Sequence, residues 1–354
     1  MAKVHNFSAG PCILPQEVMQ EAAASVINFD DLNLSILEIS HRSKNFVKVM
    51  EEAQDLVKEM LNVPKGYSVL FLQGGASTGF LMTAYNMLSA DGTAAYINTG
   101  TWSKKAIKEA KKLGNVNVVA SSEDKNFNYI PKNVEVPSNA DYLHFTSNNT
   151  IFGTQFKDFP ATDAPLICDM SSDIFSRKVN VADFDMIYAG AQKNLGPAGA
   201  TVYIVKDEVF NKSGRDIPSM LDFGIHASKE SMFNTPPVYS IYVAMLNLRH
   251  MLKNGGLSAY EKLAQDRADM LYSEIDANPL FEGSAAKEDR SSMNACFLLT
   301  DESKKERFDQ LWNQANISGI KGHRSVGGYR ASMYNALSLD SVQELVNTMK
   351  TLRA

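Results

Sequence analysis

Short apolar runs separated by longer amphipathic stretches are the feature that most limits how this chain can fold. Residues 44–61 place apolar side chains three and four positions apart, as one buried helix face does. Residues 68–72 (SVLFL) form a strand candidate, and residues 78–88 predict a second helix. Six more apolar strand candidates follow, at residues 94–97, 117–120, 142–145, 165–168, 185–189 and 202–205. Because these runs lack polar alternation, both of their faces should be covered, which predicts an α/β fold with a mainly parallel sheet flanked by helices.

The pattern changes after Asn254-Gly255-Gly256. A long amphipathic stretch follows, then a single strand candidate at residues 295–299, and the last helix is predicted to start at Ser341-x-x-Glu344, a capping-box pattern. These features predict a large domain over residues 16–255 and a smaller α+β domain over residues 256–354. Residues 1–15 are expected to pack on the smaller domain.

Composition limits the location and the partners of the chain. The 354 residues include 35 Lys or Arg and 40 Asp or Glu, a formal net charge of −5, which argues against general affinity for nucleic acid or anionic membranes. The cysteines are odd in number and form no CxxC pair, so neither a disulfide framework nor a metal site is expected (Cys12, Cys168, Cys296). With no apolar signal segment and no run of about 18 apolar residues, we expect a cytoplasmic protein that does not enter a membrane.

Two glycines lie between the strand candidate at 68–72 and the helix predicted after it. The segment reads Gln73-Gly74-Gly75-Ala76-Ser77-Thr78. Glycine lets a backbone approach a ligand closely, and free amides at a helix start attract phosphate. A plain tight turn with a capping serine would produce the same letters.

Lys193 and Asp169 each follow an apolar strand candidate. A lysine in glycine-rich backbone at a strand end can lose hydration and acquire a lowered pKa, as a Schiff-base lysine requires. A carboxylate at the carboxyl end of a strand lies where open α/β sheets bind ligands. The alternatives are a surface lysine on a loop and an aspartate that caps a turn.

Basic residues gather in two segments, His41-Arg42-Ser43-Lys44 and 323–330 (HRSVGGYR). Glycines beside the second segment would expose guanidinium groups that suit carboxylates and phosphates, although solvated basic surfaces have the same composition. Trp102 follows the strand candidate at 94–97 and could stack on a planar ring or simply pack in a core. From the residues alone, the chain is an α/β protein with a phosphate-binding turn and an anionic ligand, and neither cofactor nor reaction follows.

Together the segments resemble the phosphoserine aminotransferases, a family of class-V pyridoxal-phosphate enzymes with fold type I. The resemblance covers nearly the whole chain in order, through NFSAGPCILP, EISHRSKNF, QGGAS, HFTSNNTIFGTQF, ICDMSSDIFSR, YAGAQKNLGPAG and GHRSVGGYRASMYNA. It implies a seven-stranded sheet in the large domain. It also implies a ping-pong transamination that converts 3-phosphohydroxypyruvate and L-glutamate to O-phospho-L-serine and 2-oxoglutarate in serine biosynthesis. The phosphohydroxythreonine pair of pyridoxine biosynthesis is a second substrate set of this family.

The resemblance further implies pyridoxal 5′-phosphate as cofactor. Lys193 would bind it covalently, and Asp169 would pair with its ring nitrogen. Other implied cofactor contacts are stacking by Trp102, phosphate contacts from Ala76, Ser77 and Gln192, a ring-hydroxyl contact from Thr150, and contacts from Asn234 and Thr235 to the cofactor phosphate of the other subunit of a homodimer. Arg330 would hold the substrate α-carboxylate. The other implied substrate-binding residues, near the substrate phosphate or the glutamate side chain, are Ser8, His41, Arg42, His323 and Arg324.

The chain departs from the family pattern at Cys12, at Thr78-Gly79-Phe80 and at residues 28–34 (NFDDLNL). Two other interpretations stay open at this point. One is a different enzyme of the same fold, such as a serine–glyoxylate aminotransferase or a desulfurase, which would need a catalytic cysteine in a mobile loop. The other is a non-catalytic phosphate- or nucleotide-binding module, which would leave Lys193 and Asp169 without a role.

Overall fold

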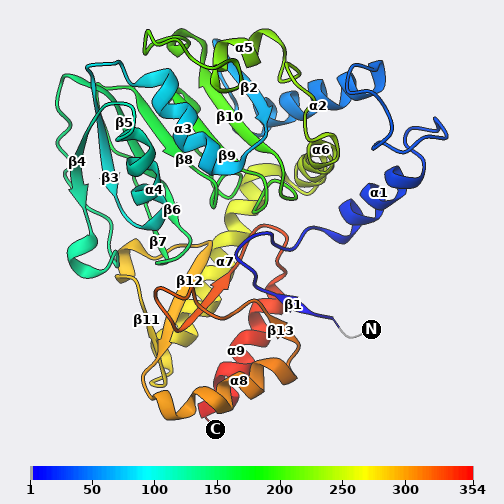
Figure 1. The fold of residues 1–354 in the computed structure, drawn as a ribbon. Coiled ribbons are helices and arrows are strands. Elements are labelled where there is room, and N and C mark those ends of the chain that lie inside the picture. The colour runs from blue at the N-terminus through cyan, green and yellow to red at the C-terminus, as the bar shows by residue number, and fades with distance from the viewer. Residues whose placement is uncertain (1–2, 354) are drawn as a thin grey trace.

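The computed structural model describes residues 3–353 (Figure 1), whose strands form one seven-stranded sheet, one three-stranded sheet and two two-stranded sheets. The helices are α1 (Gln16–Ile27), α2 (Lys44–Leu61), α3 (Gly75–Met87), α4 (Thr101–Ala110), α5 (Phe223–Ser228), α6 (Val238–Lys253), α7 (Gly256–Ala277), α8 (Lys305–Gln314) and α9 (Leu339–Arg353). The strands are β1 (His5–Asn6), β2 (Tyr67–Leu72), β3 (Thr93–Asn98), β4 (Asn115–Ser121), β5 (Ala140–Thr146), β6 (Asn148–Asn149), β7 (Thr154–Gln155), β8 (Leu166–Asp169), β9 (Met186–Gly190), β10 (Thr201–Lys206), β11 (Phe281–Gly283), β12 (Asn294–Leu299), β13 (Ile317–Ser318) and β14 (Tyr329–Ser332).

The large sheet has seven strands in the order β2-β10-β9-β8-β5-β3-β4. The pairs β3/β4, β3/β5, β5/β8 and β8/β9 are parallel, and β10 runs antiparallel to both of its neighbours. The predicted α/β class with a mainly parallel, seven-stranded sheet is therefore confirmed. Each of the seven strand candidates lies in one of these strands, with bounds that differ by a few residues.

Helices cover both faces of this sheet, which explains why its strands are apolar throughout. Along β2, Leu70 and Leu72 pack toward α3 and α4, while Val69 and Phe71 belong to the core formed with α2 and α6. Figure 1 shows α3 and α4 on one side of the sheet and α2 and α6 on the other. The arrangement leaves the carboxyl ends of the parallel strands facing the later part of the chain.

The later part of the chain forms a second core around the sheet β11-β12-β14 and helices α7, α8 and α9. The N-terminal segment joins it: β1 pairs in parallel with β13, and Phe7 is fully buried in this core. α7 begins at Gly256 and contacts both α6 and α9. The predicted domain limits stay predictions, and their outermost positions, 1–2 and 354, lie outside the described residues.

The last helix starts earlier than predicted. α9 begins at Leu339, and Ser338, rather than Ser341, accepts the capping hydrogen bond, from the Ser341 amide at 3.3 Å. Glu344 therefore lies beyond the first turn, and the predicted start at Ser341 is wrong. Within residues 3–353, none of the helices combines the length and apolar character needed to cross a membrane.

Candidate active site

A cavity of about 360 Å³ lies at the carboxyl ends of β5, β8 and β9, beside the first turns of α3 and α4. This is the edge at which open α/β sheets bind ligands, because the helices that follow the strands begin there. The lining residues come from both parts of the chain: Ala9, Gly10, Gly75, Ala76, Ser77, Trp102, Thr146, Asn148, Thr150, Ile151, Asp169, Ser171, Ser172, Gln192, Lys193, His323 and Arg330.

Lys193 places a buried amine in this cavity. The residue is 8% exposed, and its Nζ donates a hydrogen bond to Thr150 Oγ1 at 3.0 Å and lies 5.9 Å from the centroid of the Trp102 ring. Burial lowers the pKa of Lys193 to about 8, against the opposing attraction of Asp169. A substantial fraction of the amine is therefore neutral near pH 8, as a nucleophile or proton acceptor must be.

The backbone around Lys193 is held by the N-terminal segment. The Cys12 thiol donates a hydrogen bond to the Lys193 carbonyl oxygen at 2.8 Å. Gly10 has a φ of +131°, and a β-carbon there would lie 3.3 Å from Lys193 Cγ. Glycine at position 10 therefore lets the chain lie directly against the stem of the lysine.

Asp169 ends β8 and is 3% exposed. The Ser171 amide donates to its Oδ1 at 2.9 Å, and burial raises the pKa of the carboxyl group. No ion pair of Asp169 is found among residues 3–353 within 4 Å. A cation in the cavity would remove the unfavourable burial of this carboxylate, so the site suits a ligand that carries a positive charge there.

The first turn of α3 offers free backbone amides. Gly74 precedes the helix with a φ of +99°, and no side chain caps the turn or places an acid in it. Ala76 and Ser77 follow, and both line the cavity. Since helix amides and the helix dipole both favour an anion, this turn fits a phosphate group.

Two donors in the site are buried without a protein partner. Trp102, at the start of α4, has an Nε1 with no hydrogen-bond partner, and the same is true of Arg330 Nε, on β14. The Arg330 guanidinium makes one contact, from Nη1 to the Thr150 carbonyl oxygen at 3.4 Å. Buried donors normally find an acceptor, so these groups indicate that a ligand supplies one.

A family model described as Aminotransferase class-V matches residues 4–345 of the chain. The chain belongs to the class-V aminotransferases.

Relatives with a curated name agree with this family. The phosphoserine aminotransferase of Flavobacterium psychrophilum is 60% identical over 351 residues, and that of Flavobacterium johnsoniae is 58% identical over 353 residues, in each case with 99% of both chains covered. Among solved structures, phosphoserine aminotransferase from Bacillus circulans subsp. alkalophilus is similar with a TM-score of 0.96 and 42% identity, covering 99% of this chain and 98% of that one. The PLP-bound phosphoserine aminotransferase from Trichomonas vaginalis has a TM-score of 0.92 and 35% identity, covering 98% of this chain and 100% of that one.

Pyridoxal phosphate is the cofactor of this class-V aminotransferase, and the cavity fits it. The buried amine of Lys193, the buried carboxylate of Asp169 and the uncapped first turn of α3 provide an attachment point, an anionic partner for a ring nitrogen and a phosphate site. Trp102 offers an aromatic surface on the same cavity. Pyridoxal phosphate makes use of all four features.

Several predicted site residues lie outside the lining of this cavity. Arg42 is exposed just before α2, Arg324 is exposed in the loop before β14, and Ser8 lies beside Gly319. His41 is half-buried with an unpartnered Nε2. Asn234 lines a separate hollow of about 250 Å³, and Gln73 Nε2 donates to the carbonyl oxygen of the neighbouring Thr235. The roles predicted for these residues stay predictions.

Sequence reasoning passed over some polar residues of the cavity. Thr146, Asn148, Ser171 and Ser172 all line it, and Asn148 Nδ2 donates to Ser172 Oγ at 2.8 Å. Their signal was positional, because Thr146 ends β5, Asn148 lies two residues further on, and Ser171 and Ser172 lie within three residues of the end of β8. Gly10 carried no comparable local signal, since it reaches the site only through the fold of the N-terminal segment.

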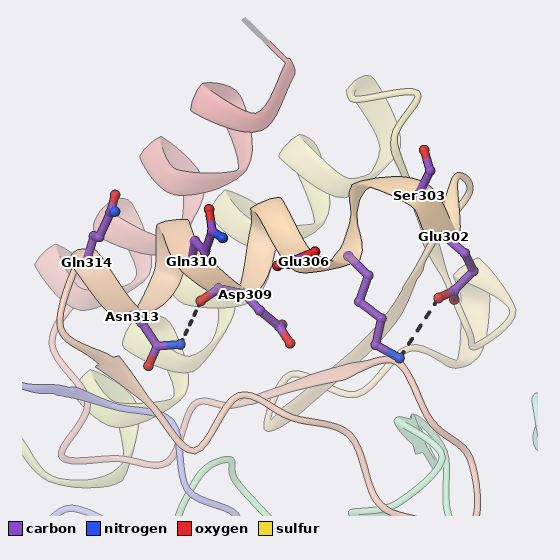
Figure 2. A pocket seen from close by; sticks show the side chains of 8 residues that line it. Glu302, Ser303, Glu306, Asp309, Gln310, Asn313 and Gln314 are labelled. Atoms are coloured by element: carbon purple, nitrogen blue, oxygen red, sulfur yellow. Dashed lines mark hydrogen bonds and ion pairs between the residues drawn. The ribbon is translucent and has the colours of Figure 1, made fainter.

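A second hollow, of about 760 Å³, lies along α8 and η6 (Glu302–Lys304) (Figure 2). Its side chains are mostly exposed and point outward from the helix. Asn313 Nδ2 donates to the Asp309 carbonyl oxygen at 2.6 Å, and Lys305 pairs with Glu302 at 3.9 Å. These groups satisfy one another on an open surface, so the hollow does not compete with the enclosed cavity as the active site.

Proposed function

We propose that this class-V aminotransferase is a phosphoserine aminotransferase that transfers the amino group of L-glutamate to 3-phosphohydroxypyruvate, giving O-phospho-L-serine and 2-oxoglutarate. The observation that carries the proposal is the buried Lys193 amine in one cavity with Asp169, Arg330 and His323. The names of relatives at 58–60% identity support the same reaction. Its place would be serine biosynthesis.

In this proposal Lys193 binds pyridoxal phosphate covalently, Asp169 faces the ring nitrogen and Trp102 stacks on the ring. Ala76, Ser77 and Gln192 hold its phosphate, and Thr150 faces the ring hydroxyl. When bound, the cofactor withdraws electrons from the α-carbon of the substrate and so makes its proton removable. Asp169 acts in this only by its charge, which favours a protonated ring nitrogen.

Lys193 also moves the proton. With the cofactor bound, its Nζ would accept the proton from the α-carbon of the amino-acid substrate and would donate a proton to the α-carbon of the keto acid in the other half-reaction. A pKa of about 8 suits both steps, because a general base and acid works best near the pH of the medium. Thr150 Oγ1, at 3.0 Å, orients the amine.

Arg330 would bind the α-carboxylate, which both substrates share, through the guanidinium whose Nε has no protein partner. The second anionic group differs, a phosphate in one substrate and a carboxylate in the other. His323, Arg324, His41 and Arg42 would bind it, with Ser8 lining the same pocket. Guanidinium and imidazole groups can bind either the phosphate or the carboxylate, because each of these anions offers several oxygen atoms as hydrogen-bond acceptors.

The proposal includes a homodimer with shared sites. Asn234 and Thr235 would reach the cofactor phosphate of the other subunit. His41 and Arg42 lie outside the lining of the cavity of their own chain, and in this proposal a second subunit presents them to the substrate. Large exposed apolar side chains on and after α1 support an interface in this region: Met19, Ile27, Leu32, Leu34 and Leu37.

Cysteine placement disfavours the desulfurase alternative. The Cys12 thiol donates a hydrogen bond to the Lys193 carbonyl oxygen, and the Cys296 thiol donates one to the Ile151 carbonyl oxygen. Burial raises the pKa of each thiol to about 12. Neither residue lines the cavity. A thiol with these properties is a poor nucleophile.

A coupled assay with glutamate as donor tests the proposal by comparing 3-phosphohydroxypyruvate with hydroxypyruvate. Loss of two charge-assisted hydrogen bonds should lower kcat/KM for the unphosphorylated keto acid by about 100-fold or more. Lys193→Ala should abolish turnover of both while the far-ultraviolet circular dichroism is unchanged. Equal rates on the two keto acids, or a fully active Lys193→Ala, would refute the assignment. We also propose a second activity on the phosphohydroxythreonine pair, which the same assay tests with that substrate. The proposed location is the cytoplasm.

A further inference from the structure

Two consecutive lysines on α4 have different surroundings. Lys104 Nζ forms an ion pair with Glu123 Oε1 and lies 5.0 Å from the centroid of the Phe127 ring. Lys105 Nζ has no carboxylate within ion-pairing distance among residues 3–353, and it lies 4.5 Å from the centroid of the Trp102 ring. Lys105 is exposed, so its charge is neither neutralised by the protein nor removed by burial.

The position of Lys105 on α4 directs its side chain toward Trp102. Positions 102 and 105 are three residues apart and share one face of α4. Trp102 lines the active-site cavity together with His323 and Arg330. The Lys105 ammonium over the Trp102 ring therefore lies beside the mouth of this cavity, although Lys105 is not one of the lining residues.

The electrostatics agree with that position. The pKa of His323 is lowered by its partial burial and by the charges of Arg330, Arg324 and Lys105. Among the described residues, none of these four basic groups is ion-paired with an acid within 4 Å. The mouth thus carries an uncompensated positive charge, to which Lys105 adds a mobile, solvated ammonium.

We propose that Lys105 is a further substrate-binding residue, which favours the phosphate-bearing keto acid over glutamate. This rests on the proposed function and adds a residue to its substrate site. A phosphate carries nearly twice the charge of a carboxylate at neutral pH, so one ammonium attracts it more strongly. Because the interaction is exposed, it acts on binding and weakens with salt. A lysine that only supported the Trp102 ring would affect both half-reactions alike.

The test uses the holoenzyme and compares Lys105→Gln and Lys105→Arg with Lys104→Gln. Lys104 is the matched control, because it is paired with Glu123 and lies over Phe127 instead of Trp102. At low ionic strength, Lys105→Gln should lower kcat/KM for 3-phosphohydroxypyruvate about five-fold and that for glutamate less than about two-fold. The inhibition constant of O-phosphoserine should rise by a similar factor. Lys105→Arg should restore the wild-type kcat/KM for 3-phosphohydroxypyruvate and the wild-type inhibition constant. At about 0.5 M salt, Lys105→Gln and the wild type should no longer differ in these constants, and Lys104→Gln should behave as the wild type.

Equal losses on the two substrates would overturn the inference in favour of ring support, and unchanged constants would show that the ammonium is not used. Either result leaves the proposed function intact, because the wild type would still prefer the phosphorylated keto acid. A wild type without that preference would instead refute the proposed function itself.

Discussion

At the scale of single residues, the active site is built at the expense of stability. Lys193 is buried, and its amine has one hydroxyl partner in the absence of cofactor. The folded chain therefore prefers the neutral amine, whereas an unfolded chain keeps it protonated up to its ordinary pKa of 10.5. Between about pH 8 and pH 10.5 unfolding takes up a proton, so the folded state loses stability as the pH falls through this range, and the loss is complete below pH 8.

This penalty predicts that cofactor-free Lys193→Met is more stable than the cofactor-free wild type at pH 7. The lowered pKa of Lys193 corresponds to a destabilisation of the folded state by about 3 kcal/mol, which the methionine removes. The methionine also loses the hydrogen bond to Thr150, which costs about 1 kcal/mol, so the net gain in unfolding free energy is about 2 kcal/mol. The folded pKa is the lower one, so the stability that the neutral amine contributes is complete above pH 10.5 and is lost as the pH falls through about 8.

Urea unfolding of the two proteins between pH 7 and pH 10.5 measures the difference, which should shrink steadily above pH 8. Lys65→Met, at an exposed position, is the control and should stay within about 0.5 kcal/mol of wild type at every pH. If the stability difference between Lys193→Met and the wild type is no larger at pH 7 than at pH 10.5, the burial argument is contradicted.

Lys193 and Asp169 could be predicted from the sequence, because each follows directly on an apolar strand and strand ends are where α/β sheets bind ligands. The resemblance supplied what spacing could not, namely the cofactor and the reaction. Gly10 and Lys105 were missed for different physical reasons. Gly10 reaches Lys193 only because the N-terminal segment packs against a distant part of the chain. Lys105 is distinguished from Lys104 by its neighbours in the fold, since Lys104 pairs with Glu123 and Lys105 lies over Trp102.

At the scale of elements, helix starts were the least predictable feature. The helix expected from residue 78 begins at Gly75, because Gly74 adopts a φ of +99° and turns the chain into α3 three residues earlier. Helix propensity disfavours glycine and so hides this start. The shift matters for function, since it turns the glycine pair from a loop into the amide-rich end of a helix.

Glycines also shape the loop between β13 and β14, which carries His323 and Arg324. The Gly322 amide donates to the Gly328 carbonyl oxygen at 2.9 Å, closing the loop. A β-carbon at Gly328 would lie 2.7 Å from the Phe297 carbonyl oxygen and 2.4 Å from Leu298 Cδ2. Gly328 therefore lets the loop lie directly on β12.

Gly328→Ala should displace this loop and weaken substrate binding, while Gly327→Ala is its matched control. Both positions have a positive φ, +58° and +78°, so each variant pays about 1 kcal/mol for backbone strain. Only Gly328 is crowded, because nothing lies within 4 Å of a β-carbon at Gly327. We expect KM for 3-phosphohydroxypyruvate to rise about ten-fold or more in Gly328→Ala, with a further loss of about 1–3 kcal/mol in unfolding free energy. Similar constants for the two variants would show that contact with β12 does not position the loop.

At the scale of the whole molecule, the N-terminal segment packs against the later part of the chain. β1 pairs with β13, the Tyr334 hydroxyl donates to the Ala9 carbonyl oxygen at 3.0 Å, and the segment continues to Gly10 at the active site. The pairing involves two residues in each strand, separated by most of the sequence. Such a short, distant contact has no periodic signal, so only the general expectation that residues 1–15 pack on the later part of the chain could be formed in advance.

The dimer is a proposal that rests on the family resemblance, and subunit mixing tests it. Lys193→Ala lacks the attachment residue, and Arg42→Ala lacks a residue that lies outside the cavity of its own chain. If the partner subunit's Arg42 completes each site, a hybrid dimer of the two variants has one site in which both residues are intact. Random reassortment makes half of the dimers hybrids, so about a quarter of all sites should be active.

Mixing the two inactive or weakened variants after mild unfolding and refolding should therefore restore up to about a quarter of wild-type turnover with 3-phosphohydroxypyruvate. Lys193→Ala mixed with Lys193→Ala/Arg42→Ala is the matched control, because no arrangement of those chains contains an intact lysine. Size-exclusion chromatography with light scattering follows the dimer in every mixture. If dimers reassort and turnover stays at the average of the separate variants, each chain completes its own site, and the cavity of the single chain must then close over Arg42 by a movement of the segment before α2.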